Sequence, residues 1–241
     1  MPNYVMLLSF VGTKFHGWQV QPGLRTVQGV LKEAIEKVLC EPVKLTGCCR
    51  TDAGVHALEY VANFSAEKTL ESETLLKALN SLLPEDVGIK RIWLQEGFNS
   101  RFGVKGKVYL YRILNSHYRD PFLEPFYWRL PYRLDFERML SASELFLGIH
   151  DFSGFAKLEE EDKNTLIEVE WVEFKKVDEL IEFRIRARRF LRYMVRRIIG
   201  SIIYVGLRKL SVEDIRAYLE GKGRCPYTAK AKGLTLEKVF F

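Results

Sequence analysis

Two apolar rhythms alternate along this chain, and their alternation restricts the fold more than any other feature. Residues 4–11 form a nearly unbroken apolar run, which is typical of a buried strand. Residues 27–39 place apolar side chains three and four positions apart, the period of an amphipathic helix, and Thr26 precedes them as a candidate N-cap. Because strand-type and helix-type segments follow one another repeatedly, we expect an α+β fold with helices packed on a sheet.

The remaining segments continue this alternation over the 241 residues. Further strands are predicted at residues 43–47, 58–64, 87–94, 104–115, 166–177, 180–187 and 234–241. Further helices are predicted at residues 72–83, 135–147, 190–205 and 211–219. The second half of the chain thus repeats the inventory of the first, which predicts two similar α+β halves, residues 1–104 and residues 105–241.

Charge and cysteine usage indicate the compartment and the kind of partner. Lys and Arg outnumber Asp and Glu by 37 to 31, and the net charge of +6 favours an anionic partner such as nucleic acid. The longest apolar run, residues 198–207, is too short to span a bilayer, and the N-terminus lacks a secretory signal. The four cysteines form no C-x-x-C pair and the four histidines are scattered. We therefore predict a cytoplasmic protein with no membrane span and no metal site.

Motifs for nucleotide, serine or metal chemistry are missing from the sequence, which has no P-loop, dinucleotide glycine fingerprint, G-x-S-x-G elbow or H-E-x-x-H pair. Aromatic and basic residues instead interleave at residues 14–21, 98–112 and 188–197. Such mixtures suit RNA with flipped or unstacked bases, since cations hold phosphates and flat rings stack on bases. Core aromatics beside surface cations give the same pattern, so both interpretations stay open at this point.

The segment C-C-R-T-D-A-G-V-H, residues 48–56, carries a single acid, Asp52, between Arg50 and a turn-forming Ala53-Gly54 pair. One interpretation is a solvated loop carboxylate that caps its own turn. The other is a catalytic carboxylate held in place on a loop.

Seven segments, in matching order and spacing, carry a resemblance to a known family. They are G-T-x-F-x-G-W-Q (12–19), R-T-V-Q (25–28), R-T-D-A-G-V-H-A (50–57), R-F with K-x-Y-x-Y (101–102 and 107–111), G-x-H-D-F-x-x-F (148–155), F-L-x-x-M-V-R-x-I-x-G (190–200) and A-x-G-L-x-L (231–236). On these segments the chain resembles the TruA family, tRNA pseudouridine synthase I, nearly from end to end. Cys49, Leu166 and Lys230 depart from the family pattern.

The resemblance implies a fold and an activity. The fold has two similar α+β halves whose mixed, mainly antiparallel sheets join into one sheet, with helices packed outside and a central cleft. The activity is that of an isomerase that converts uridine to pseudouridine in the anticodon stem-loop of tRNA, at tRNA positions 38–40, with no cofactor. The partners are the anticodon arm of tRNA and a second copy of the chain in a homodimer.

The resemblance also assigns roles to individual residues. Asp52 is the catalytic carboxylate, which either attacks C1′ of the ribose or removes a ribose proton. Arg196 matches the basic partner of that aspartate, which favours the charged carboxylate in an enclosed site. Tyr109 matches the residue that packs on the flipped uracil.

Further residues of the same motifs are predicted to bind the substrate. Arg50 is implied to fill the space that the flipped base leaves, or to hold a phosphate. His56, Trp18, Gln19 and Arg101 complete the predicted substrate-binding set.

The expected strand at residues 107–113 predicts which side of the sheet Tyr109 faces. Alternation along a strand puts Tyr109 and Tyr111 on one side and Val108 and Leu110 on the other. Since Val108 and Leu110 are the apolar pair, we expect them to face the helices and the two tyrosines to face the opposite side.

Two rival functions use part of the same residues. A module that binds single-stranded RNA needs the aromatics and cations, but a carboxylate that faces phosphates would repel them. A glycosidase-like enzyme needs two carboxylates, and the R-T-D-A-G-V-H-A segment carries only one, Asp52. Formation of pseudouridine in an anticodon stem-loop distinguishes all of these.

Overall fold

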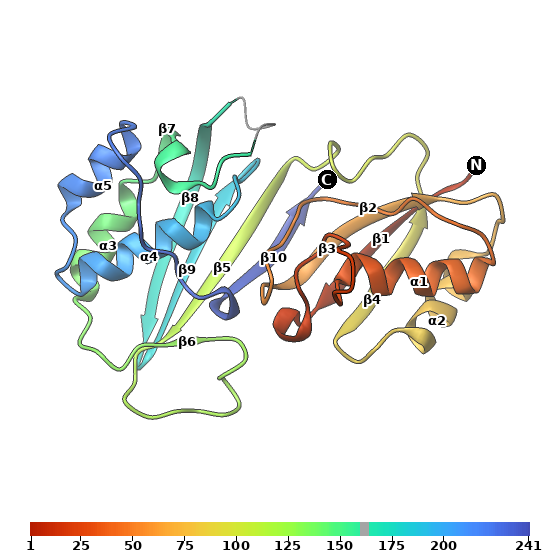
Figure 1. Cartoon of the computed structure of the whole chain (residues 1–241), viewed down its shortest axis with the longest axis horizontal. Helices are drawn as coiled ribbons and strands as arrows, with labels where there is room; N and C mark the ends of the chain where they lie inside the picture. The colour runs from red at the N-terminus through yellow and green to blue at the C-terminus, as the bar shows by residue number, and fades with distance from the viewer. Residues whose placement is uncertain (160–163) are drawn as a thin grey trace. The chain divides into compact units, whose positions relative to one another are not determined.

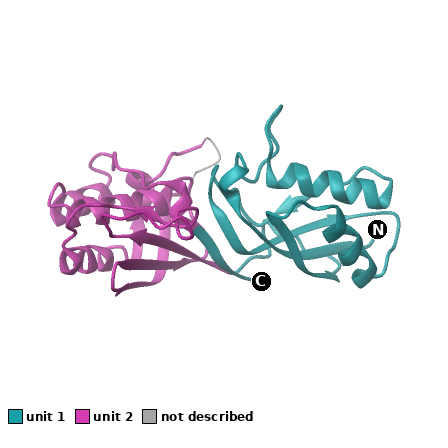
Figure 2. Cartoon of the chain, turned by 90° about the horizontal axis from the view of Figure 1, so that it is seen from below, with its two compact units in different colours: residues 1–105, 235–241 teal, residues 106–234 magenta. Residues whose placement is uncertain are grey.

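The computed structural model describes residues 1–159 and 164–241, whose helices and strands Figure 1 shows. The chain divides into two compact units, residues 1–105 with 235–241 (unit 1) and residues 106–234 (unit 2), coloured separately in Figure 2. Each unit combines helices with strands, and most strand pairs are antiparallel. The predicted α+β class with mixed, mainly antiparallel pairing is therefore confirmed.

Unit 1 is built on strands in the order β4-β1-β3-β10, with a short strand, β2, that pairs with β3. The strands are β1 (Asn3–Phe10), β2 (Thr46–Gly47), β3 (His56–Ser65), β4 (Val87–Leu94) and β10 (Leu234–Phe240). β1 is antiparallel to β3 and β4, whereas β10 is parallel to β3 and places Thr235 opposite His56. The last strand of the chain thus borders the strand that begins at His56.

The helices of unit 1 cover this core. They are η1 (Gly12–Lys14), α1 (Val27–Leu39) and α2 (Ser72–Leu82). The hydroxyl oxygen of Thr26 accepts a hydrogen bond from the Gly29 amide at 3.2 Å, which confirms the predicted N-cap. α1 ends where Cys40 adopts the left-handed conformation with a φ of 55°. α1 contacts α2, and α2 contacts β4.

Unit 2 is built on strands in the order β5-β9-β8-β7, with β6 parallel to β5. The strands are β5 (Gly106–Leu114), β6 (Trp128–Arg129), β7 (Gly148–Asp151), β8 (Leu166–Val177) and β9 (Leu180–Ala187). β8 and β9 form a hairpin whose turn contains Asp178 at a φ of 52°. The hairpin has the predicted bounds, because its apolar alternation and its polar turn are both local features.

The helices of unit 2 pack on one another and on the hairpin. They are α3 (Phe136–Glu144), η2 (Phe152–Phe155), α4 (Met194–Gly206), α5 (Val212–Leu219) and η3 (Ala231–Gly233). α3 contacts α4 and β8, and α5 contacts η2. The side chain of Asp135 caps α3, and Ser211 with Asp214 forms a capping box on α5.

One predicted helix begins later than expected. The helix predicted at residues 190–205 is α4, which begins at Met194. Tyr193 precedes it with a φ of 63°, a left-handed conformation that a continuing helix excludes. Leu191 and Arg192 therefore lie before the helix, which begins four residues later than predicted.

One predicted strand is also shorter than expected. Of the segment at 43–47, only Thr46–Gly47 forms a strand. The segment contributes apolar side chains to the core instead, since Val43 and Leu45 are buried.

Candidate active site

The loop that carries Asp52 connects β2 to β3 in unit 1. Thr51 is buried, Asp52 is half-buried and Arg50 is exposed. The Val55 amide donates to the Asp52 carbonyl oxygen at 3.2 Å, and Gly54 has a φ of +80° between them. This tight turn places the carboxylate of Asp52 at the boundary between core and solvent.

A second segment, residues 12–18, holds this loop through the backbone. The Trp18 amide donates to the Thr51 carbonyl oxygen at 3.2 Å. The Gly54 amide donates to the Phe15 carbonyl oxygen, also at 3.2 Å. The two hydrogen bonds lie on either side of Asp52 in the loop, so its backbone is fixed from both ends.

Two glycines allow the segment and the loop to approach so closely. A Cβ on Gly12 would lie 2.0 Å from the Val55 carbonyl oxygen, and a Cβ on Gly17 would lie 2.4 Å from the Thr51 carbonyl oxygen. Gly17 also has a φ of +86°, which favours glycine. Any side chain at either position would push the loop away. The two glycines of the G-T-x-F-x-G-W-Q motif therefore allow it to pack directly against the R-T-D-A-G loop.

His56 and Trp18 are buried, each with 2% of its surface exposed. Nδ1 of His56 accepts a hydrogen bond from the Gly12 amide at 3.0 Å. The Trp18 ring stacks on Tyr60 with centroids 4.2 Å apart, and the Tyr60 hydroxyl donates to the Cys49 carbonyl oxygen. Both predicted substrate-binding side chains thus lie beneath the Asp52 loop and support it.

Gln19 and Arg101 are exposed, as is Arg50. The Arg101 guanidinium lies 5.6 Å from the centroid of Phe102, whose ring is 75% exposed. These side chains are accessible to a ligand from solvent.

Arg25, in the R-T-V-Q motif, supports the same segment and was not predicted as a site residue. Its guanidinium makes two hydrogen bonds of 2.8 Å with the carboxylate of Asp86 and lies 3.9 Å from the centroid of Phe15. Its carbonyl oxygen accepts from the His16 amide at 2.9 Å. The pKa of Asp86 is lowered, chiefly by the side-chain hydrogen bonds from Arg25 and to a smaller extent by the charge of Lys14.

Tyr109 lies on β5 in unit 2 and is 7% exposed. Its ring meets the Phe190 ring edge-on, with centroids 5.0 Å apart. Val108, Leu110 and Tyr111 are buried as well, so both faces of β5 are covered at this point. Only a small part of the Tyr109 ring is accessible to a ligand.

Arg196 lies in the first turn of α4. Its Nε donates to the Ala229 carbonyl oxygen at 2.8 Å, and the Ala229 amide donates back to the Arg196 carbonyl oxygen at 2.9 Å. Burial raises the pKa of Tyr111 well above its usual range, and the nearby charge of Arg196 partly opposes this effect. The Tyr111 hydroxyl donates to the Lys230 carbonyl oxygen at 2.8 Å. Within unit 2, Arg196 is therefore close to the strand face that Tyr109 shares with Tyr111.

Two of the three departures from the family pattern, Cys49 and Lys230, make their contacts through the backbone. Cys49 and Lys230 each contribute a carbonyl oxygen, to Tyr60 and Tyr111. Since every residue has this carbonyl, the two departures preserve both contacts. Leu166 is the first residue of β8 and is 58% exposed.

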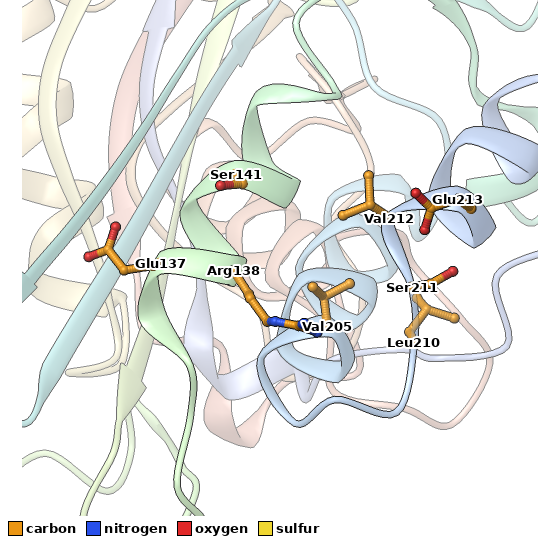
Figure 3. Close-up of a pocket in the computed structure, with 8 residues that line it drawn as sticks. All are labelled: Glu137, Arg138, Ser141, Val205, Leu210, Ser211, Val212 and Glu213. Atoms are coloured by element: carbon orange, nitrogen blue, oxygen red, sulfur yellow. The ribbon is translucent and has the colours of Figure 1, made fainter.

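A pocket of about 520 Å³ lies in unit 2 among α3, α4 and the start of α5 (Figure 3). Its lining residues are Glu137, Arg138, Ser141, Val205, Leu210, Ser211, Val212 and Glu213. Ser211 caps α5, and Nε of Arg138 lies 3.7 Å from the carboxylate of Asp135. None of the predicted site residues lines this pocket, and two of its polar residues, Arg138 and Ser211, pair with acids at the start of α3 and of α5.

Two further features bear on the class of site. Among the described residues, no three or more His, Cys, Asp or Glu side chains gather in a way that could hold a metal ion. No helix within residues 1–159 and 164–241 has both the length and the apolar character that a membrane crossing requires.

Comparison with known proteins identifies the family. The profile of the family described as tRNA pseudouridine synthase matches residues 6–97 and 142–241. A tRNA pseudouridine synthase A of Aquifex aeolicus (strain VF5) is 53% identical over 99% of both chains. Proteins of the same name from Hydrogenobaculum sp. (strain Y04AAS1) and Thermoanaerobacter sp. (strain X514) are 40% and 38% identical over the full length of both chains.

Solved structures are more distant. A Cbf5-Nop10-Gar1 complex matches with a TM-score of 0.37 and 14% identity, over 96% of this chain and 57% of that chain. Structural similarity at that level adds nothing to the sequence comparison. The family is identified by the profile match over most of the chain and by full-length identities of 38–53%. The chain belongs to the tRNA pseudouridine synthase family.

Proposed function

We propose that this protein isomerises uridine to pseudouridine in the anticodon stem-loop of tRNA. The observation that carries the proposal is the half-buried position of Asp52 on a firmly held loop. Two backbone hydrogen bonds fix this loop, and Gly12 and Gly17 pack closely against its backbone. A solvated carboxylate that only caps a turn needs no such support. A catalytic carboxylate does, because small displacements of a reacting group lower the rate severely.

The reaction needs one charged carboxylate. The N1–C1′ bond of the uridine breaks, the uracil turns, a C5–C1′ bond forms, and the proton on C5 is replaced by one on N1. No electron is gained or lost and no group is added, so the proposed reaction uses no cofactor. Asp52 either attacks C1′ or removes a ribose proton, and the base returns to the same carbon in both routes.

Residues of unit 2 are proposed to act on the same nucleotide. Tyr109 is proposed to pack on the flipped uracil, since a flat ring holds a base while it turns. Arg196 is proposed to supply positive charge that favours the ionised carboxylate during the reaction. The hydrogen bond from its Nε to the Ala229 carbonyl oxygen supports this role, because an anchored cation loses little freedom when the substrate binds.

The proposed roles of the remaining predicted residues depend on whether each side chain is exposed or buried. Arg50, Gln19 and Arg101 are exposed and are proposed to contact the RNA directly. His56 and Trp18 are 2% exposed, and we propose that they act by holding the Asp52 loop. The tRNA substrate also implies a cytoplasmic location, and a homodimer is proposed from the family resemblance.

Release of tritium from RNA that contains [5-³H]uridine tests the function directly, because C5 loses its hydrogen. We expect release from an anticodon stem-loop transcript, with pseudouridine in the digested RNA. A protein that only binds RNA would retain the transcript without release. A glycosidase would liberate free uracil. Either result would overturn the proposal.

A further inference from the structure

The segment between β5 and β6, residues 115–127 (the β5–β6 loop), is an ordered structure. The Ser116 hydroxyl oxygen accepts a hydrogen bond from the Tyr118 amide at 3.1 Å. The carboxylate of Asp120 accepts from the Phe122 amide at 2.9 Å. The loop therefore uses its own polar side chains to stabilise its turns, as compact functional loops do.

The body of unit 2 also anchors the β5–β6 loop. Nη1 of Arg129 donates to the carbonyl oxygen of His117 at 3.2 Å, and Lys232 forms an ion pair with Glu124. Arg129 belongs to β6 and Lys232 to η3, so two separate elements hold the loop. In Figure 1 the loop extends from the end of the β5 arrow, beside the label β6.

Two aromatic rings project from this anchored loop into solvent. Tyr118 is 81% exposed and Phe122 is 90% exposed. Exposed single apolar residues are common, but two large rings four positions apart on a loop that is otherwise hydrogen-bonded indicate a contact surface.

The charge around these rings is positive. The pKa of Glu124 is lowered, first by its hydrogen bond with Lys232 and then by the charges of Arg119 and Arg129. Three cations, Lys232, Arg119 and Arg129, thus stand against the two carboxylates of the loop, Glu124 and Asp120, so one positive charge is left in excess on the loop and its anchors. Aromatic faces next to cations form the chemistry that binds nucleic acid bases and phosphates together.

We propose that the β5–β6 loop is a second RNA-binding site, which stacks Tyr118 and Phe122 on bases and holds phosphates with Arg119. The inference rests on the proposed function, which supplies the RNA. Five residues of β5 separate Tyr109 from the loop, so the loop begins about 20 Å along the strand from Tyr109. The loop therefore binds a part of the RNA several nucleotides away from the target uridine.

A second copy of this chain fits the loop less well than RNA does. In a two-fold symmetric contact the same patch lies on both sides, so the excess positive charge of one loop would face that of the other. The chain also has a net charge of +6, which adds to that repulsion. RNA brings the opposite charge and flat partners for both rings.

Loop variants with matched controls test the site in the full-length protein. The Tyr118→Ser/Phe122→Ser double variant removes both rings, and Ile149→Ser removes a 66% exposed side chain from the edge strand β7 as a control. Arg119→Glu reverses one charge beside the rings, and Lys176→Glu makes the same change in net charge on the exposed end of β8. Each protein is titrated with full-length tRNA transcript at several salt concentrations and is assayed for tritium release.

We expect the double variant to bind full-length tRNA about tenfold more weakly, with unchanged turnover at saturating RNA. Arg119→Glu should weaken binding and reduce the salt slope by about 1, while both controls stay near the parent protein. The losses should vanish with a stem-loop too short to extend about 20 Å from the target uridine.

Three outcomes would overturn the inference while leaving the proposed function intact. They are unchanged tRNA affinity in the loop variants, an equal loss with the short stem-loop, and a changed oligomeric state with unchanged affinity. Absence of tritium release by the parent protein would instead contradict the proposed function. Binding is measured separately from turnover, so the two failures are distinguishable.

Discussion

Gly17 and Thr51 lie so close that a Cβ on the glycine would be 2.4 Å from the threonine carbonyl oxygen. Thr51 directly precedes Asp52, so this contact sets the position of the proposed catalytic loop. The contact is made between backbones, and it depends on the absence of a side chain at residue 17.

Gly17→Ala should therefore displace the Asp52 loop. The substitution must strain a φ of +86° and also move the Thr51 carbonyl oxygen, so we expect it to lower turnover at least about tenfold. Gly23→Ala is the matched control, because Gly23 has a φ of +72° with nothing within 4 Å of its Cβ position. Backbone strain alone should cost the control about 1–2 kcal/mol of unfolding free energy and leave turnover near normal. Urea denaturation and tritium release measure the two effects, and equal turnover in both variants would argue against the contact.

Asp52→Asn should fold and bind tRNA but release no tritium. The change is nearly isosteric and removes only the negative charge that the reaction needs. Binding by filter retention and tritium release are measured on the same preparation. Turnover above the trace expected from deamidation back to aspartate would remove Asp52 from its proposed role.

Substitutions at Tyr109 separate stacking from proton transfer. Tyr109→Phe keeps the ring and Tyr109→Leu keeps only the bulk, and both should fold because the site is buried and apolar side chains fit it. If stacking on the uracil is the main role, the Phe variant keeps RNA binding and turnover while the Leu variant loses turnover. If the hydroxyl accepts or donates a proton when C5 loses its hydrogen, the Phe variant binds and stalls. Normal turnover by the Leu variant would make Tyr109 a purely structural residue.

Substitutions at Arg196 separate charge from anchoring. Arg196→Lys keeps the charge but loses the Nε donor to Ala229, whereas Arg196→Met loses both. We expect kcat to fall sharply for Met and only partly for Lys, with KM changed little, because the charge acts in the reaction. The free energy of unfolding should fall by about 1 kcal/mol in both, the usual contribution of one hydrogen bond. Equal kcat values for the two variants would indicate an anchoring role alone.

The ion pair between Arg25 and Asp86 predicts a pH dependence of stability. Arg25 lowers the pKa of Asp86 in the folded protein, so the pair stabilises the fold above the unfolded pKa of aspartate, about 3.9. This contribution is lost as the pH falls through the lower, folded pKa. The side chains are 37% and 21% exposed, so Asp86→Asn should lower the unfolding free energy by only about 0.5–1 kcal/mol at pH 7. Urea denaturation of both proteins from pH 7 to pH 2 measures the difference, which should shrink below about pH 4. A difference that grows at low pH would contradict the assignment.

Local patterns predicted most elements of the fold. The hairpin of β8 and β9 and the strand β4 have the predicted bounds, and Thr26 caps α1 as predicted. These features depend on side-chain alternation, turn residues and caps, which act over a few neighbouring positions. The motif around Asp52 could likewise be recognised from the sequence alone, and with it the family.

Other features depend on contacts between segments that are far apart in the chain. The start of α4 is set by the left-handed Tyr193, although the apolar period continues before it. The short edge strand β7 exists because β8 lies beside it, and its four residues carry no distinctive alternation. Such choices are made by tertiary packing, which outweighs local preference where a segment is short.

The division of the candidate residues was also decided by the tertiary structure. By itself, the sequence indicated the proposed chemistry, with Asp52 among aromatic and basic residues, and it placed His56 and Trp18 in the same class as Gln19 and Arg101. Only folding buries His56 and Trp18 beneath the Asp52 loop and leaves the other two in solvent, because burial depends on which segments pack together. Periodicity along the chain carries no information about how closely two distant backbone segments approach. Gly12 and Gly17 let their segment pack against the backbone of the Asp52 loop, and this contact holds Asp52 in place.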